Sequence, residues 1–418
     1  MIQRIRRVLG NPVTRNAFFL LLLTMSNYLV YFLTVPYQAR VLGAELFGKV
    51  AFATAIAAYF QLFFDFGFML SGTAQIASAD GDVRAMSRIN STIILAKLPL
   101  LGVALVALTV MCFSVPAIAE DPALYVLAIL SVAPASLLPD YVYRGIQRMR
   151  PMSVRVIGFR LLSALLLFAV VRSPADYLLV PVTILVGNAA SLVWTLADIR
   201  RRGIRWVSVP AITAWRALRE SSSFFASRAA TASYTALNVV AVGAHYGSAS
   251  LALAHYSAAD RLIVAVKTAA TPVVDSIYPY MVRSRNHRAL WRVFWLLVPA
   301  WWLGCLALAV WSEPIVETIF GPSFAPAAIP LTLLAPVAMI SLPSMLLGFP
   351  ALTPLGRSRE VNVSNIAGAL LHLAQVGWLL LAGSFSVVNV CVASIVTEVF
   401  ILAFRIVSVR RAMVHTRA

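Results

Sequence analysis

The chain has 418 residues, of which 61% are hydrophobic and only 12% are charged, and it carries a formal net charge of +18. A soluble domain is typically about 45–50% apolar and about 25% charged. This composition therefore excludes an ordinary water-soluble protein and leaves no room for a sizeable soluble catalytic domain. It predicts a protein whose surroundings are the lipid bilayer.

A helix needs about 20 mainly apolar residues to cross a bilayer. The chain contains twelve such runs, separated by charged and turn-forming residues, and they predict an all-α membrane protein with 12 transmembrane helices. The runs lie at about 16–36, 46–70, 89–113, 122–143, 153–172, 176–197, 218–243, 250–281, 290–311, 324–350, 361–383 and 386–409. The first run lacks a small-x-small cleavage site, so we expect it to remain as a helix rather than to be removed as a signal peptide.

Basic residues gather in alternate loops between these runs. Arg4, Arg84, Arg148, Arg201 and Arg288 are examples of the arginines that fall on one predicted side. Because basic loops stay in the cytoplasm, this alternation predicts that both termini are cytoplasmic. The positive charge is then a topology signal, and no nucleic acid partner is expected, since nucleic-acid binding needs one clustered basic face.

A long basic loop divides the predicted helices into two sets of six. We expect an N-terminal six-helix lobe at 1–197, a basic cytoplasmic inter-lobe loop at 198–217 and a C-terminal six-helix lobe at 218–418. Glycine turns at Gly43 and Gly247 recur at one offset along the chain, and the prolines Pro139 and Pro343 recur at the same offset. The pattern predicts a parallel pseudo-repeat of two six-helix lobes around a central cavity.

Charged side chains occur inside several predicted spans. They are Lys97, Arg160, Arg228, Arg261, Lys267, Asp65, Asp260, Asp275 and Glu398. A charge facing lipid at the centre of a bilayer costs about 2.5–3.5 kcal/mol, so most of these groups must face a wet cavity or one another. Lys97 and Arg160 each stand alone, and we expect them to extend toward a membrane interface.

The predicted eighth helix carries the densest polar stripe. Asp260, Arg261, Lys267 and Asp275 fall on one broad face at helical spacing, and Pro272 should loosen the helix between them. Two other spans also have polar faces. These faces comprise Asn27, Tyr31 and Gln38 in the first span, and Arg228 and Asn238 in the seventh.

Two interpretations of the charged groups remain open. They pair between helices and hold the bundle together, or they line a polar pathway in which basic groups bind an anionic substrate and carboxylates exchange H⁺ or Na⁺. No pair of histidines has the spacing of metal ligands, so neither a metal site nor a cofactor is predicted. No Gly-x-x-x-x-Gly-Lys-Ser/Thr run is present either, which argues against a nucleotide-driven pump.

Several segments resemble a known family. The stretch from Pro36 to Gly48, followed by Tyr59-Phe60 and Asp65-Phe-Gly-Phe68, resembles the opening of the bacterial polysaccharide (O-antigen) flippases. These flippases belong to the multidrug/oligosaccharidyl-lipid/polysaccharide exporter superfamily.

Later segments continue the likeness, which covers essentially the whole chain. Pro139–Met149 is similar to the exit of the family's fourth helix, although Tyr143-Arg144-Gly145 replaces the aromatic-aromatic-Gln-Gly form expected there. Tyr256–Arg261 and Ile277–Tyr280 resemble the eighth helix, and Ile319–Phe324 resembles the entry to the tenth.

The resemblance implies two lobes that open alternately to either side of the membrane. Such proteins move an undecaprenyl-pyrophosphate-linked oligosaccharide from the cytoplasmic to the periplasmic leaflet, and a polysaccharide polymerase and a chain-length regulator are the partners to consider. Passing these polar groups through hydrocarbon is prohibitive without compensating partners. We therefore expect Arg228, Arg261 and Lys267 to hold the pyrophosphate and sugars.

The remaining polar residues have secondary roles in this hypothesis. Asn27, Tyr31, Gln38 and Asn238 are candidate substrate-binding residues. Asp65, Asp260 and Asp275 are candidates for coupling transport to a cation gradient.

Three alternatives are weighed against a flippase. A cation-coupled exporter of drugs or small metabolites should have a more acidic cavity. A polyprenyl-linked glycosyltransferase or polymerase should have loop carboxylates for acid–base chemistry, and the outer loops here are very short. A major-facilitator transporter usually has a patterned loop after its second helix, which Ala79–Arg84 does not match.

Overall fold

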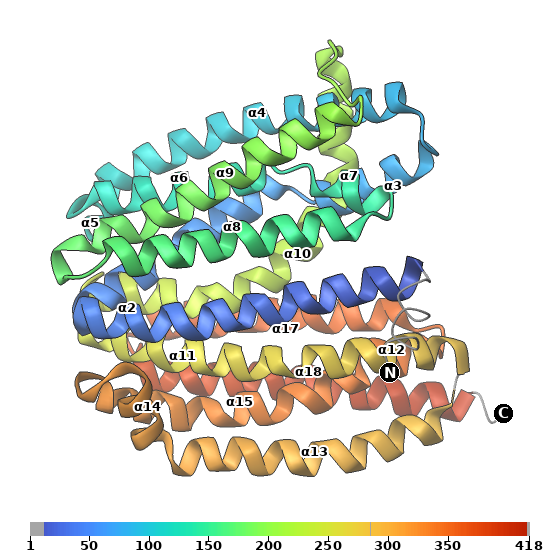
Figure 1. The fold of residues 1–418 in the computed structure, drawn as a ribbon. Helices are drawn as coiled ribbons and strands as arrows, with labels where there is room; N and C mark the ends of the chain where they lie inside the picture. Colours follow the sequence, from blue (N-terminus) through green and yellow to red (C-terminus); the bar gives the residue numbers. More distant parts are fainter. Residues whose placement is uncertain (1–11, 285, 416–418) are drawn as a thin grey trace, which may run out of the picture. The chain divides into compact units, whose positions relative to one another are not determined.

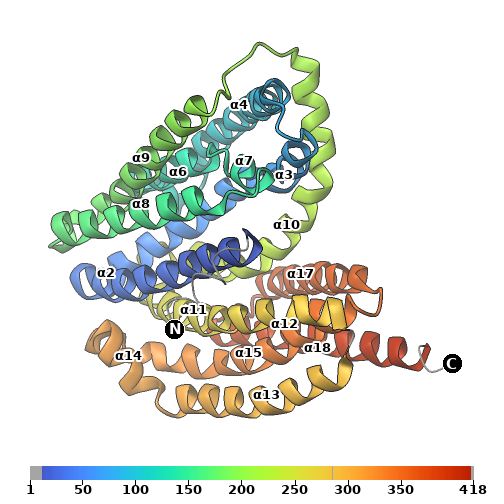
Figure 2. The ribbon, with the colours of Figure 1, turned by 45° about the vertical axis from the view of Figure 1, so that its right-hand side comes forward.

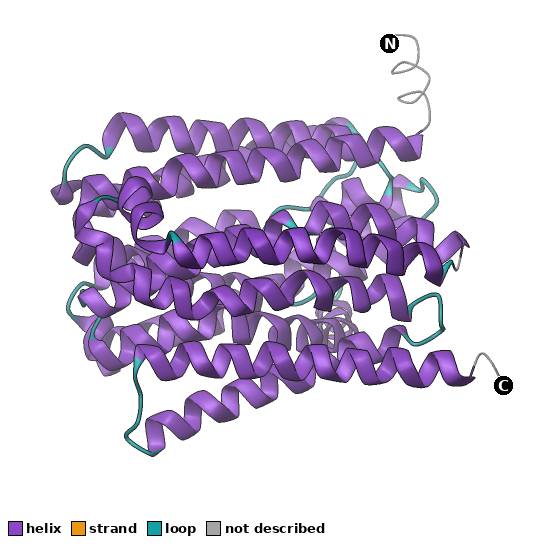
Figure 3. Ribbon diagram, turned by 90° about the horizontal axis from the view of Figure 1, so that it is seen from below, coloured by secondary structure: helices purple, strands orange, loops and turns teal. Residues whose placement is uncertain are grey.

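The computed structural model describes residues 12–284 and 286–415, and every regular element in these two ranges is a helix (Figure 1). Figure 3 shows the helices joined by short loops, with no strand in the described residues. The prediction of an all-α protein is therefore confirmed.

The side chain of Arg228 lies outside this description, although its backbone is part of a helix.

The chain divides into two compact units. The first contains the chain up to Leu42 together with Ala53–Ala229, and the second contains Gly43–Phe52 together with the chain from Ala230 onward. Two long helices, α2 (Pro12–Asp65) and α10 (Ala211–Tyr246), contribute residues to both units. The lobes expected at 1–197 and 218–418 stay predictions.

The 54-residue helix α2 is interrupted at one glycine. Gly43 has φ 76° and ψ 171°, which is not a helical conformation, and the helix continues on either side of it. Gly247, after the end of α10, also has a positive φ of 97°. Such backbone conformations strongly favour glycine, as the two predicted turns require.

The two prolines of the predicted repeat have different structural settings. Pro139 lies at the break between α6 (Pro122–Ser136) and α7 (Asp140–Gly145), where it precedes the first residue of α7. Pro343 lies inside α15 (Ala328–Leu347), close to its C-terminal end. The glycine turns thus match between the two sequence halves more closely than the prolines do.

The first unit contains long helices together with several short ones. Besides α6 and α7, they are α3 (Phe68–Ser78), α4 (Val83–Ser114), α5 (Pro116–Ala119), α8 (Met149–Val170), η1 (Pro174–Leu178) and α9 (Leu179–Arg201). Helix α9 packs against both α6 and α8, and α3 packs against α7 (Figure 1). The core beneath α3, α4 and α7 contains fully buried Phe68, Ile93 and Tyr143.

The second unit is organised around α15. Its other elements are α11 (Leu251–Ala269), α12 (Thr271–Ser284), α13 (His287–Val310), α14 (Ser312–Phe320), η2 (Pro322–Ala327), α16 (Phe349–Leu352), α17 (Ser358–Leu381) and α18 (Val387–His415). Helices α11, α13 and α18 all pack on α15, and α17 packs on α18 (Figure 2). This places α18 between α15 and α17, where polar side chains from several helices can meet.

Nine segments of the described chain are long and apolar enough to cross a membrane, which makes this a multi-pass membrane protein. One of them, Leu22–Ser78, covers the first predicted span from residue 22 onward and all of the second, and the kinked α2 joins the two. The predicted seventh and eighth spans are not among these nine: the apolar stretch found in the described part of α10 is Ala236–Tyr246, and α11 carries several charges. The number of twelve therefore remains a prediction.

An ion pair inside the first unit ties α7 to α8. Arg155 Nη2 lies 2.6 Å from Asp140 Oδ1, and the Arg155 side chain is fully buried. Its Nη1 donates to Thr195 Oγ1 on α9 at 2.6 Å, so one guanidinium joins three helices.

We expect Arg155→Ala to lower the free energy of unfolding by roughly 3 kcal/mol, because it leaves the Asp140 carboxylate without its partner. The thermal unfolding of the purified protein in detergent measures this effect. Arg148→Ala removes an exposed arginine from the residue that precedes α8 and is the matched control. Equal unfolding temperatures for the two variants would contradict a structural role for the buried pair.

Candidate functional site

Helix α11 begins with a side-chain cap and ends where the sequence predicts a weak point. Ser250 Oγ accepts a hydrogen bond from the backbone N–H of Leu253, which satisfies one of the free N–H groups of the first turn. The helix stops at Ala269, and α12 starts at Thr271 with Pro272 as its second residue. The loosening predicted at Pro272 is confirmed. The polar stripe therefore crosses two helices rather than one.

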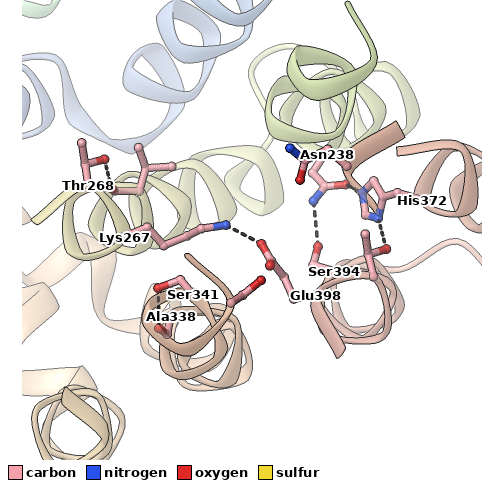
Figure 4. Close-up of polar contacts among 12 residues, drawn as sticks. Asn238, Lys267, Thr268, Ala338, Ser341, His372, Ser394 and Glu398 are labelled. Atoms are coloured by element: carbon pink, nitrogen blue, oxygen red, sulfur yellow. Dashed lines mark hydrogen bonds and ion pairs between the residues drawn. The ribbon is translucent and has the colours of Figure 1, made fainter. Parts of the chain in front are cut away.

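Lys267, in the last turn of α11, forms an ion pair with Glu398 on α18. Its Nζ lies 2.6 Å from Glu398 Oε1, and Figure 4 shows the two side chains pointing toward each other. The Lys267 side chain is 25% exposed and the Glu398 side chain 8%. A carboxylate and an ammonium therefore balance each other within this unit, which lowers the cost of burying either charge.

A second group of polar side chains lies beside this ion pair. It consists of Asn238 on α10, His372 on α17, and Ser394 and Thr397 on α18, and we call it the polar cluster. His372 Nε2 lies 2.8 Å from Asn238 Oδ1, and Asn238 Nδ2 donates to Ser394 Oγ at 2.9 Å (Figure 4). His372 is 1% exposed and Thr397 likewise 1%.

Arg261 has a different setting from Lys267. Its guanidinium carbon lies 4.8 Å from the centre of the Phe47 ring, a cation–π distance. Phe47 is itself packed edge-on against Phe324, with ring centres 5.4 Å apart. The neighbouring Gly48 lies so close to Ala254 that an added Cβ would be 3.0 Å from its backbone nitrogen. This tight packing fixes the ring on which Arg261 rests.

The two acidic residues of the predicted stripe are separated. Asp260 is half-buried on α11, where the charges of Lys267 and Arg261 act on it. Asp275 is exposed on α12. The structure therefore brings Asp260 near the basic residues, whereas Asp275 lies in the helix beyond the break.

Candidate residues of the first unit form a smaller set. Asn27 Oδ1 accepts a hydrogen bond from Arg160 Nη1 at 2.7 Å. Tyr31 is half-buried, with its ring edge-on to Phe32, and Gln38 is buried. Asp65 is half-buried in the last turn of α2.

The expectation that Lys97 and Arg160 stand alone is wrong. Lys97 is only 6% exposed, and its ammonium donates to the backbone carbonyl of Ser136. It also lies 5.9 Å from the centre of the Phe68 ring. Arg160 bonds Asn27, as described above. Both cations find partners on other helices, so neither needs to extend to an interface.

His372 was missed in the sequence. Metal-ligand spacing does not single out this lone histidine, but an ionisable side chain at membrane depth in the predicted span 361–383 is itself a sign of a functional site. Arg228 lies outside the side chains that the structure describes. Within the described residues, no group of three His, Cys, Asp or Glu side chains could hold a metal ion.

We expect Lys267 and Glu398 to behave as one unit in unfolding. Lys267→Met alone should lower the free energy of unfolding by roughly 3 kcal/mol, because it leaves a buried carboxylate unpaired. The double variant with Lys267→Met and Glu398→Gln should be more stable than Lys267→Met alone by at least about 1 kcal/mol, because substitutions of residues in contact are not additive. Thermal unfolding of the two single variants and the double variant in detergent gives the coupling energy.

The pair Arg357 and Glu360 serves as the control for this cycle. It has the same 2.6 Å separation, but its side chains are 33% and 26% exposed. We expect a coupling of about 0.5 kcal/mol or less there, as for other exposed pairs. Simple additivity at Lys267 and Glu398 would show that their contact contributes nothing to stability.

Comparison with known structures shows a shared fold. An inward-closed structure of the lipid II flippase MurJ superposes with a TM-score of 0.69 at 12% identity, covering 93% of this chain and 87% of that one. An inward-facing multidrug resistance MATE family transporter of the MOP superfamily gives a TM-score of 0.63 at 16% identity, with coverage of 92% and 95%. At such low identities the likeness concerns the fold alone.

Comparison of sequences adds the family. A protein of Escherichia coli K12, provisionally named an O-antigen transporter, is 25% identical over 406 residues, which is 95% of this chain and 96% of that protein. A Shigella dysenteriae protein of the same provisional name matches equally well. These names confirm the prediction of a transporter and not an enzyme. Residues 13–285, more than half of the chain, match the family described as polysaccharide biosynthesis protein, so the chain belongs to that family.

Proposed function

We propose that the protein is a flippase that moves an undecaprenyl-pyrophosphate-linked oligosaccharide from the cytoplasmic to the periplasmic leaflet of the bacterial inner membrane. The observation that carries the proposal is the placement of Arg261 and Lys267 on a helix of a multi-pass membrane protein, each held by a specific partner. The family, and the relatives provisionally named O-antigen transporters, support the same substrate class.

The chemistry of the substrate explains why such cations are needed. A pyrophosphate and several sugars carry charges and hydroxyl groups that cannot lose their hydration without compensation. In the proposal, Arg228, Arg261 and Lys267 supply positive charge to the pyrophosphate. Asn27, Tyr31, Gln38 and Asn238 supply hydrogen bonds to the sugars.

The transport cycle in this proposal is alternating access of two six-helix lobes. The kinked α2 would provide two of the 12 transmembrane helices, and α10 and the pair α11 and α12 would provide the seventh and eighth. Basic loops would hold both termini in the cytoplasm. A gradient of H⁺ or Na⁺ would drive the cycle by antiport, with Asp65, Asp260 and Asp275 as the acidic residues available for ion exchange.

The same proposal has consequences for partners. A flippase of this kind delivers its glycan to enzymes on the periplasmic side of the membrane. A polysaccharide polymerase and a chain-length regulator are therefore the proteins that we would test for association.

The decisive experiment is translocation in proteoliposomes. The purified protein is reconstituted with a fluorescent undecaprenyl-pyrophosphate-linked oligosaccharide, and the exposure of the label in each leaflet is followed with and without Na⁺ and pH gradients. Flipping that requires the protein supports the proposal. Absence of flipping, together with transport of a cationic drug, would instead assign the chain to drug export.

Substitution of the basic residues tests their role in that assay. We expect Arg261→Ala and Arg228→Ala to abolish translocation while the protein still folds, because the anionic headgroup loses its counter-charge. The lysine variants keep the charge and should retain part of the rate. Arg283→Ala removes an exposed arginine near the end of α12 and is the control. Normal transport by both alanine variants would show that these arginines are structural.

A further inference from the structure

His372 is a buried titratable side chain that the proposed transport path does not use. It lies on α17 with 1% of its surface exposed. One ring nitrogen faces α10 and the other faces α18, so the imidazole links three helices of the second unit (Figure 4). A change in the protonation of this imidazole therefore acts on hydrogen bonds between those helices.

The hydrogen bonds around His372 can be followed atom by atom. Asn238 Nδ2 donates to Ser394 Oγ at 2.9 Å, so its Oδ1 is the atom left to face His372 Nε2 at 2.8 Å. A carbonyl oxygen only accepts hydrogen bonds, so Nε2 must carry a hydrogen. This side of the ring is therefore a donor in either protonation state.

The other side of the ring depends on the proton. His372 Nδ1 lies 3.0 Å from Thr397 Oγ1, and the Thr397 hydroxyl donates to the backbone carbonyl of Ala393 at 2.9 Å. A hydroxyl has one hydrogen, so while Ala393 receives it, the oxygen can only accept from a protonated Nδ1. In the neutral ring Nδ1 can only accept, so keeping this hydrogen bond requires the Thr397 hydroxyl to turn from Ala393 and donate to Nδ1. The two states thus differ by one proton and one hydroxyl rotation.

The charges around His372 come from two helices. From α18, the Glu398 carboxylate acts on the imidazole, and the Cys391 thiol lies on the same helix. From α11, Lys267 binds Glu398, and Tyr256 and Asp260 lie around the Asn238 side of the cluster. Asn238 from α10 and Gln375 from α17 are polar and uncharged. A proton on His372 therefore has Glu398 as its nearest compensating charge.

We propose that His372 is a proton-binding site that couples translocation to a pH gradient. Imidazole suits this role because it is the side chain that changes charge near neutral pH. The bond to Asn238 connects the site to α10, one of the two helices whose residues belong to both compact units. The inference rests on the proposed flippase function for its transport consequence, but the proton site itself is testable without transport.

The direct test is the protonation state of His372. The full chain, labelled with ¹⁵N-histidine and reconstituted in lipid, is measured by solid-state NMR across a pH range of about 5 to 8. The chain has five histidines, and His372→Gln identifies the signal that belongs to this one. We expect its Nδ1 to change from unprotonated to protonated as the pH falls. A ring that stays in one state over this range would overturn the proposal.

A second variant keeps the test valid where His372→Gln fails to fold. Thr397→Val retains the imidazole and removes the hydroxyl that faces Nδ1. We expect the midpoint of the His372 titration to shift in this variant, because one of the two states has lost its partner. An unchanged midpoint would overturn the proposed switch of hydrogen bonds between His372 and Thr397.

A transport assay then tests whether His372 couples translocation to a pH gradient. Translocation of a fluorescent undecaprenyl-pyrophosphate-linked oligosaccharide is measured with a pH gradient of either direction and without one. In the wild-type protein we expect the gradient to change the rate. In His372→Gln the rate with the gradient should equal the rate without it, while exchange in the absence of a gradient persists. His245→Gln alters an exposed histidine near the end of α10 and should behave as wild type.

The outcomes separate the two proposals. A wild-type response to the gradient that persists in His372→Gln overturns the coupling role of His372 and leaves the flippase function intact. A wild-type protein that moves no glycan overturns the proposed function, and the NMR titration still decides whether His372 binds a proton.

Discussion

The structure depends on the cost of placing charge inside an apolar, helix-packed protein. Each unit contains buried charged side chains that pair with groups on another helix, which offsets this cost. Arg155 is bound by Asp140 in the first unit, and Lys267 by Glu398 in the second. Arg405, which is 7% exposed, reaches the carbonyl and hydroxyl of Ser344 on the neighbouring α15. These contacts fix which helices lie next to one another. They also leave a few buried polar positions where binding of a proton or an anion can change how these charges are compensated.

Local signals explain why the helical architecture was predictable. Apolar runs of bilayer length, Gly43 and Gly247 at turns, and Pro272 at a break all act through the backbone or through immediate neighbours. The number of membrane spans is harder to predict than the helical architecture. The polar residues that mark α11 as a candidate site also lower its hydropathy, so that composition alone does not identify it as a span.

The polar helix faces of the candidate site could be predicted from the sequence, but the contacts that these faces make could not. Periodicity places Lys267 and Asn238 on polar helix faces, but it does not say what they meet. Glu398 is 131 residues from Lys267 in the chain, and His372 is 134 residues from Asn238. Such pairings arise from the packing of α17 and α18 against other helices, which the pattern of one sequence does not encode. Lys97 shows the same limit, because its partner is a backbone carbonyl with no sequence signature.

The turns at Gly43 and Gly247 have a consequence for how this chain tolerates change. A Cβ added at either glycine would meet no atom within 4 Å, so there is ample space for a side chain. The requirement for glycine is therefore one of handedness alone: an L-residue is strained at these positive φ angles, while its mirror image would fit. A substitution at either glycine is therefore opposed by the backbone conformation and not by crowding.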